Sequence, residues 1–134
     1  YALRSLYAAG ADGVILGKRN WMTAAGVVCR ASAGASEEMP VYVAESEIDA
    51  ARLFQTNGYR LVAADLDNST PMTKANLKKP LLLAVGGEKR GLSSELLTMA
   101  DEIVRIEYGR EFKESLSAAS AASILSFFVL AQNS

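Results

Sequence analysis

Short apolar runs alternate along the chain with stretches in which apolar residues recur every three or four positions. The apolar runs are rich in leucine or β-branched residues and are bounded by glycine, proline, asparagine or aspartate, which is typical of strands. They predict strands over residues 13–16, 41–43, 61–64, 81–85 and 103–106. Because helical stretches separate these runs, the order predicts an α/β domain with a mostly parallel sheet and helices on both faces.

The clearest helix follows the second of these runs. A capping box from Ser46 to Asp49 marks its start, and Asn57 followed by Gly58 marks its end. Its apolar residues recur on one face, at Ile48, Ala51 and Phe54. This spacing predicts a helix that packs against the sheet.

Two further helices are predicted over residues 20–30 and 116–132. The second is long and rich in alanine and serine, and Ile124, Leu125 and Phe128 lie on one of its faces. Tyr1 already lies in a helical pattern, whereas residues 67–79 form a long irregular segment. Since no repeat or linker divides the chain, we expect a single domain over residues 1–134.

Composition limits the chemistry that this domain can carry. The 134 residues are 50% apolar and 22% charged, as in water-soluble globular proteins with a proper core. Because the sequence shows neither a membrane span nor a signal peptide, we expect a cytoplasmic protein. Cys29 is the only cysteine and histidine is absent, which excludes an internal disulfide, a cysteine-rich zinc site and a histidine base. Catalysis would have to use Arg, Lys, Glu, Asp, Ser or Tyr.

A glycine-rich loop follows the predicted strand 81–85. Its sequence, VGGEKRGLSS at residues 85–94, lies beyond the carboxyl end of a strand, where parallel α/β sheets bind ligands. Leu92 and Ser93 stand where a P-loop needs a Lys-Ser/Thr pair, and the glycine spacing does not match the dinucleotide fingerprint G-x-G-x-x-G. The spacing therefore excludes a phosphate loop and leaves either another ligand site or a tight, solvated, charged turn.

A second unusual loop follows the predicted strand 103–106. Its sequence, IEYGREFKESLSAASAA at residues 106–122, passes through polar residues and enters the last helix with serines at Ser115 and Ser117. Taken alone, these serines indicate no more than a cap for that helix. Two strand ends thus carry two unusual loops.

Together the loops resemble motifs of the SpoU/TrmH-type RNA ribose 2′-O-methyltransferases of the SPOUT class. The family's second motif, G-x-E-x-x-G-hydrophobic-S, is similar to residues 86–93 at every position. Its third motif, I-P-M-x-G followed by S-L-N, is similar at Ile106, Ser115 and Leu116. Its proline, methionine and asparagine are replaced by Glu107, Tyr108 and Ser117. Residues 1–16 resemble the end of the first motif, N-x-G-x-x-x-R, and place Arg4 on its arginine.

The resemblance covers nearly the whole chain and implies a SPOUT-type fold whose C-terminal segment forms a trefoil knot. It implies that S-adenosyl-L-methionine is held largely by backbone groups of the motif loops, where glycine permits close approach because it has no Cβ. Carried over by position, the cofactor contacts are Gly86, Gly87, Ile106, Tyr108, Ser115 and Leu116. The family's first strand, and any N-terminal RNA-recognition domain, are expected to precede Tyr1.

The activity that the resemblance implies is S-adenosylmethionine-dependent methylation of a ribose 2′-hydroxyl in ribosomal or transfer RNA. Methyl transfer from a sulfonium needs alignment and charge stabilisation, and it needs no metal. The implied catalytic residues are Arg4, Glu88, Ser115 and Ser117. Arg4 would grip the phosphate beside the target and stabilise the developing alkoxide, because guanidinium stays protonated in proteins. Glu88 would orient Arg4 or a loop amide, and the serines would hold loop, cofactor and substrate.

The resemblance also implies a homodimer that uses the last helix. Small residues there would allow close approach of a second copy, with two phenylalanines as bulkier anchors: Ala118, Ala119, Ala121, Ala122, Phe127 and Phe128. The expected partners are therefore RNA and a second copy of the chain, without metal or membrane.

Charge and the departures from the motifs leave a second class of function open. The net charge of −1 argues against an extended nucleic-acid surface, although basic residues lie in or near the loops at Lys18, Arg19, Lys89, Arg90, Arg110 and Lys113. Ser117 offers one hydroxyl where the family's asparagine offers a longer amide, and Glu107 replaces a rigid proline. The alternative is a non-catalytic SPOUT-type RNA-binding or dimerisation module, although the complete motif around Glu88 favours the enzyme.

Overall fold

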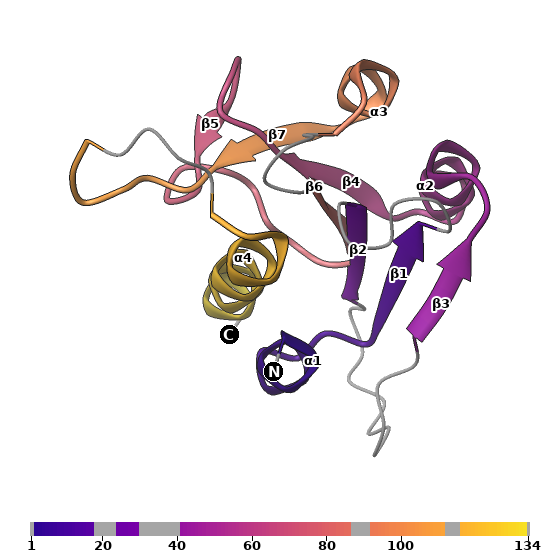
Figure 1. The fold of residues 1–134 in the computed structure, drawn as a ribbon, viewed down its shortest axis with the longest axis horizontal. Coiled ribbons are helices and arrows are strands. Elements are labelled where there is room, and N and C mark those ends of the chain that lie inside the picture. The colour runs from indigo at the N-terminus through magenta and orange to yellow at the C-terminus, as the bar shows by residue number, and fades with distance from the viewer. Residues whose placement is uncertain (1, 18–23, 30–40, 87–91, 112–115, 134) are drawn as a thin grey trace.

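The computed structural model describes residues 2–17, 24–29, 41–86, 92–111 and 116–133 (Figure 1). The helices in these residues are α1 (Ala2–Ala8), α2 (Glu47–Thr56), α3 (Ser94–Met99) and α4 (Ala118–Gln132). The strands are β1 (Gly13–Gly17), β2 (Ala24–Cys29), β3 (Val41–Ala44), β4 (Arg60–Ala64), β5 (Thr70–Pro71), β6 (Leu81–Gly86) and β7 (Glu102–Arg105). All five predicted strands are present, as β1, β3, β4, β6 and β7, and the long irregular segment contains only the short β5.

The described strands form one sheet in the order β3-β1-β2-β6-β4-β7-β5. Strand β1 runs parallel to β3, and β4 runs parallel to both β6 and β7. Strand β2 is antiparallel to its two neighbours, β1 and β6. The prediction of an α/β fold with a mostly parallel sheet is therefore confirmed.

The predicted helix over residues 20–30 is wrong where the structure describes it. Residues 24–29 form β2, whose backbone pairs with β1 on one side, for example Val28 with Gly13, and with β6 on the other, for example Ala24 with Gly86. The spacing of apolar residues within this segment gives no information about β1 and β6, whose backbone groups form hydrogen bonds along both of its edges. Val27 and Val28 are β-branched residues, which favour strands. Residues 20–23 and 30 lie outside the described residues.

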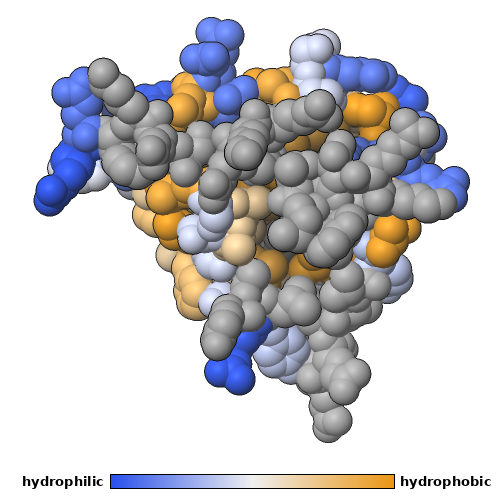
Figure 2. All heavy atoms as spheres, in the orientation of Figure 1, coloured by the Kyte–Doolittle hydropathy of each residue, from blue (hydrophilic) through white to orange (hydrophobic). Residues whose placement is uncertain are grey.

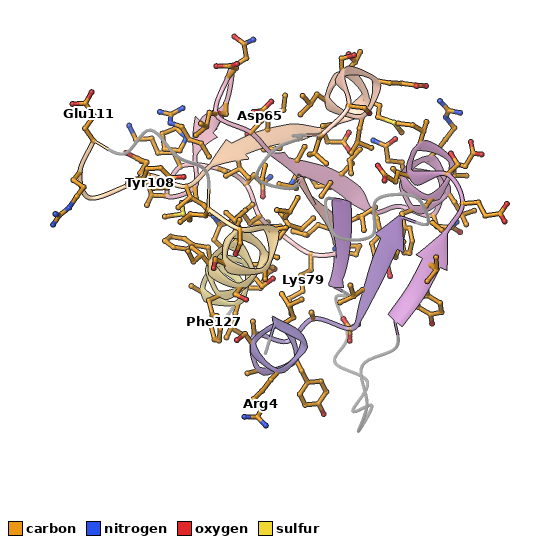
Figure 3. All side chains as sticks on the ribbon, viewed as in Figure 1. Arg4, Asp65, Lys79, Tyr108, Glu111 and Phe127 are labelled. Carbon is orange, nitrogen blue, oxygen red and sulfur yellow. The ribbon has the colours of Figure 1, made fainter. Side chains whose placement is uncertain are left out.

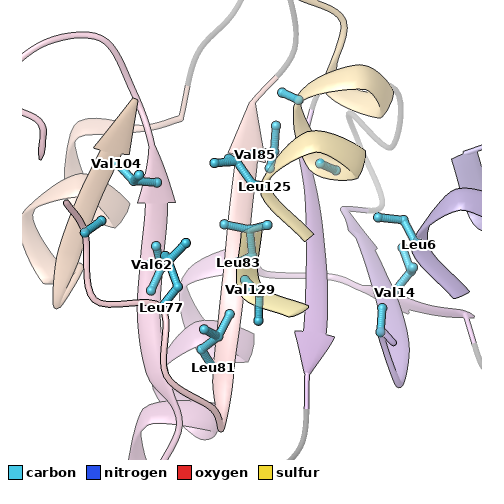
Figure 4. Close-up of a cluster of buried hydrophobic side chains, with 14 residues drawn as sticks. Leu6, Val14, Val62, Leu77, Leu81, Leu83, Val85, Val104, Leu125 and Val129 are labelled. Carbon is cyan, nitrogen blue, oxygen red and sulfur yellow. The ribbon is translucent and has the colours of Figure 1, made fainter. Parts of the chain in front are cut away.

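Helices cover both faces of the sheet because neighbouring strand residues point to opposite sides. On β6, Leu81, Leu83 and Val85 join a buried cluster with α1 and α4 (Figure 4). Leu82 and Ala84 instead join a second cluster with α2 and α3. Figure 1 shows the same division, with α1 beside α4 and both chain ends on that side. The prediction of helices on both faces is confirmed.

Helix α2 has the predicted ends. The Ser46 side-chain oxygen accepts a hydrogen bond from the Asp49 backbone N–H at 3.1 Å, and Asn57 closes the helix. Gly58 follows with a φ of 89°, a conformation that glycine adopts without strain. Ala51 is buried, as expected for the core-facing side.

Helix α4 begins two residues later than predicted, and Ala121 and Ala122 face the core. Leu125 is fully buried, which confirms the predicted apolar face. Ala121 and Ala122 are buried in the same cluster, so the expectation that these two residues present a surface to a second copy is wrong. Phe127 is exposed, whereas Phe128 packs against the cluster. The small side chains of Ala121 and Ala122 let α4 pack close to the sheet.

The end of α4 is fastened to the irregular segment between β5 and β6. The Gln132 amide donates to the Ala75 carbonyl at 2.6 Å and accepts from the Leu77 N–H at 2.8 Å. The Asn133 amide donates to the Leu77 carbonyl at 2.9 Å and accepts from the Lys79 N–H at 3.1 Å. These bonds satisfy backbone groups that no strand partner reaches, so the segment is ordered by a helix distant in sequence.

None of the described helices is both long and apolar enough to span a membrane.

Candidate functional site

A pocket of about 130 Å³ lies at the carboxyl ends of β4, β6 and β7. Its walls come from the ends of these strands, the loop after β7 and the start of α4. The lining residues are Ala64, Asp65, Leu66, Val85, Gly86, Val104, Arg105, Ile106, Tyr108, Leu116 and Ala121. This is the edge of a parallel sheet at which α/β proteins bind ligands.

Sheet register brings the wall segments together. Strand β4 lies between β6 and β7, with Ala63 opposite Ala84 and Ala64 opposite Val104. The three strands run in the same direction, so the chain leaves each of them at the same edge. The Asp65 N–H also donates to the Val104 carbonyl at 3.0 Å and holds the start of the loop after β4 against β7.

The pocket wall is largely apolar and carries few polar side chains. Asp65 is half-buried, and its Oδ1 accepts a hydrogen bond from the Leu66 N–H at 2.7 Å. The Arg105 guanidinium donates to the Ser69 carbonyl. Tyr108 is half-buried and stands on the loop after β7. An apolar wall with a few fixed polar groups is typical of a small-molecule site.

Four of the six residues expected to contact a cofactor line this pocket together: Gly86, Ile106, Tyr108 and Leu116. They come from three separate segments of the chain, namely the end of β6, the loop after β7 and the residues before α4. The other two, Gly87 and Ser115, lie outside the described residues, as does Glu88.

The structure places Ser117 at a helix cap. Its Oγ accepts a hydrogen bond from the Ser120 N–H at 3.1 Å and donates to the Ser120 Oγ at 3.0 Å. Ser117 is not among the residues that line the pocket, although Leu116 next to it is. A capping role for this serine is therefore confirmed, and a role in chemistry stays a prediction.

Arg4 is exposed on α1 and does not line the pocket. Figure 3 shows its side chain at the opposite end of the molecule from Asp65 and Tyr108, pointing away from α4. A single copy of the chain thus does not bring Arg4 to the predicted cofactor residues.

The contribution of β4 to the pocket was not predicted from the sequence. Asp65 directly follows the predicted strand 61–64. This position could have identified it as a pocket residue, because the loops after parallel strands meet at one edge of the sheet. Arg105 was missed because it lies within a predicted strand. The described residues hold no group of three or more His, Cys, Asp or Glu side chains that would bind a metal.

Comparison with known sequences identifies one family over almost the whole chain. The SpoU rRNA Methylase family matches residues 1–127. A protein of Staphylococcus saprophyticus assigned to the TrmH family of tRNA/rRNA methyltransferases is 31% identical over 127 residues, which are 95% of this chain and 51% of that protein. The chain thus spans about half the length of this relative.

Solved structures share the fold. An RNA 2′-O ribose methyltransferase has a TM-score of 0.75 and 25% identity, covering 98% of this chain and 50% of its own. An AdoMet-bound rRNA methyltransferase from Sinorhizobium meliloti has a TM-score of 0.74 and 25% identity, with the same coverage of 98% and 50%.

Proposed function

The chain belongs to the SpoU rRNA methylase family, a family of tRNA/rRNA methyltransferases, and on this premise we propose that it methylates a ribose 2′-hydroxyl in ribosomal or transfer RNA. S-adenosylmethionine is the proposed methyl donor. One observation carries the proposal: Gly86, Ile106, Tyr108 and Leu116, which are distant in sequence, line one pocket at the carboxyl edge of the sheet. The structural likeness to a 2′-O ribose methyltransferase supports the same chemistry.

The pocket residues suit a nucleoside with a flexible tail. Val85, Leu116 and Ala121 offer apolar surface to a purine ring, and Gly86 lets the main chain approach closely. We assign the donor contacts to Gly86, Ile106, Tyr108 and Leu116, with Gly87 and Ser115 beside them. When bound, the donor supplies an electrophilic methyl group on its sulfonium.

The chain's own residues position the RNA and stabilise charge. The proposed role of Arg4 is to bind the phosphate next to the target ribose and to stabilise the alkoxide that develops on the 2′-oxygen. Arginine stays protonated in proteins, so Arg4 is not assigned the role of base. The 2′-hydroxyl proton is proposed to pass to solvent water as the 2′-oxygen takes the methyl group and the donor leaves as its demethylated thioether. Glu88 would orient a guanidinium or a loop amide, and Ser115 would hold the loop after β7. The cap at Ser117 fixes the start of α4 beside the pocket.

Homodimerisation is proposed to complete the site. Tyr7 on α1 and Phe127 and Leu130 on α4 are exposed, and α1 lies against α4. Figure 2 shows apolar and weakly polar side chains over α4, while strongly hydrophilic ones gather at the periphery. The same helix reaches the pocket through Ala121. A two-fold contact through α1 and α4 would bring the Arg4 of one copy toward the pocket of the other.

The dimer is expected in solution at micromolar concentration. Replacing the exposed Phe127 with aspartate should shift the mass toward the monomer, since a buried charge without a partner disfavours an interface. Sedimentation equilibrium measures this mass. Leu53→Asp on α2, which is exposed on the other face of the sheet, is the matched control and should leave the dimer intact. A monomeric wild-type mass would contradict the proposal.

A trefoil knot is also proposed for the C-terminal segment. Four hydrogen bonds join Gln132 and Asn133 to Ala75, Leu77 and Lys79 between β5 and β6. The proposal rests on this contact between the end of α4 and a segment distant in sequence.

The proposed function predicts that the protein binds S-adenosylmethionine and leaves a 2′-O-methyl mark on RNA, with no added metal. Calorimetry measures donor binding, and transfer of a labelled methyl group to ribosomal and transfer RNA measures activity. Mapping the modified position distinguishes ribose from base. Methylation of a base would show that the ribose assignment is wrong.

The alternative is a non-catalytic SPOUT-type RNA-binding or dimerisation module, and the separation of Arg4 from the pocket in one copy favours it. Binding of donor and RNA without any methyl transfer would establish this alternative.

A further inference from the structure

Asp65 is an acidic residue that lines the pocket, just after the strand that lies between the two strands leading into the motif loops. It directly follows β4, and β4 lies between β6, which ends at Gly86, and β7, which leads to Ile106. Among the described residues that line the pocket, it contributes the only carboxylate. None of the three family motifs includes Asp65, so its place in the pocket comes from the sheet alone.

The Asp65 carboxylate is held in place yet keeps hydrogen-bonding capacity. Its Oδ1 accepts the Leu66 N–H at 2.7 Å, which fixes the side chain. Within the described part of the chain, its Oδ2 has no hydrogen bond and the carboxylate has no ion pair. Arg105, the cation that also lines the pocket, donates from one guanidinium nitrogen to the Ser69 carbonyl. A carboxylate accepts up to about four hydrogen bonds, so Asp65 has capacity for a ligand with hydroxyl donors.

We propose that Asp65 accepts hydrogen bonds from the ribose hydroxyls of the bound nucleoside, which makes it a specificity-determining residue for the donor. The inference rests on the proposed function, because it requires a nucleoside in this pocket. A vicinal diol presents two O–H donors to one carboxylate. In dinucleotide-binding α/β folds an acidic residue recognises ribose hydroxyls in the same way, near a glycine-rich turn that approaches the rest of the nucleotide. Gly86 and Asp65 have this arrangement at adjacent strand ends.

Asp65→Asn tests the contact with little change of shape, because the amide oxygen still accepts the Leu66 N–H. Calorimetry should show that this variant binds S-adenosylmethionine and S-adenosylhomocysteine about ten- to a hundredfold more weakly than the wild type, the usual range for a hydrogen bond to a charged group. The loss should be equal for the two ligands, since both carry the same ribose. Asp67→Asn makes the same change on an exposed residue outside the pocket lining and should bind as the wild type does.

Removing the ribose hydroxyls from the ligand tests the same contact in the wild-type protein, without any effect of a substitution on folding. An S-adenosylhomocysteine analogue without the 2′- and 3′-hydroxyls should bind the wild type more weakly, and Asp65→Asn should weaken that analogue no further. Equal affinity of wild type and Asp65→Asn for S-adenosylhomocysteine would overturn the inference. A loss confined to S-adenosylmethionine would also overturn it, because the carboxylate would then face the sulfonium. Failure of the wild type to bind either ligand would refute the proposed cofactor itself.

Discussion

Arg4→Ala is expected to lower the rate of methyl transfer by about 10²–10³-fold while the dissociation constant for S-adenosylmethionine stays unchanged. Arg4 is exposed on α1 and does not line the pocket, so its removal should break no contact with the donor. The rate should fall because the proposed role of Arg4 is to stabilise charge in the transition state. Arg4→Lys should recover little of the lost rate, because a lysine ammonium cannot form the two parallel hydrogen bonds by which a planar guanidinium would contact phosphate and ribose oxygens. Single-turnover rates on RNA and calorimetry with the donor measure the two quantities.

Arg52→Ala is the matched control for Arg4→Ala. Arg52 is likewise an exposed arginine on a helix, but α2 covers the opposite face of the sheet from α1. Its replacement should leave methylation unchanged. Normal turnover by Arg4→Ala, in a preparation whose wild type is active, would remove Arg4 from the mechanism.

Mixed dimers distinguish whether Arg4 acts on its own pocket or on that of the partner. Arg4→Ala keeps a pocket and lacks the arginine. Gly86→Val keeps the arginine, and at donor concentrations well below its raised dissociation constant its own pocket stays empty. Refolded as an equal mixture, the two should regain roughly a quarter of wild-type activity if Arg4 acts across the dimer, because half of the dimers are mixed and each holds one complete site. If Arg4 acts within its own chain, the mixture stays inactive.

Gly86→Val is expected to weaken binding of S-adenosylmethionine by about ten- to a hundredfold or more. Gly86 is the last residue of β6 and lines the pocket, so a β-branched side chain there would occupy the space proposed for the adenosine. Overpacking of this kind costs about 1–3 kcal/mol, which corresponds to that change in affinity. Valine suits a strand, so the variant should fold and its thermal unfolding should resemble that of the wild type.

Gly109→Val is the control for this substitution. A Cβ at Gly109 would meet nothing within 4 Å, and Gly109 does not line the pocket, so donor affinity should be retained. Gly86→Ala should give an intermediate loss because its side chain is smaller. If a folded Gly86→Val protein binds the donor as tightly as the wild type does, the site assignment is wrong.

Helix caps and the spacing of apolar residues were enough to predict the elements that such features mark. The capping box at Ser46 and the stop at Gly58 define α2 without reference to the rest of the chain, because both act on backbone groups within one turn. The alternation of Leu81 to Val85 places helices on both faces, since successive strand residues point in opposite directions. Residues 24–29 carry no comparable signal, and their local pattern predicted a helix.

The sequence by itself determined the α/β class, five of the strands, the ends of α2 and the motif residues that point to the family. Only the tertiary structure decided that residues 24–29 pair as β2, that Ala121 and Ala122 face the core, and that Asp65 joins Gly86 and Ile106 at one pocket. It also decided that Arg4 lies apart from this pocket in a single copy. The physical reason is the range of the interactions. Caps and periodicity act over a few residues, whereas strand order, register and the meeting of loops depend on contacts between segments far apart in the chain.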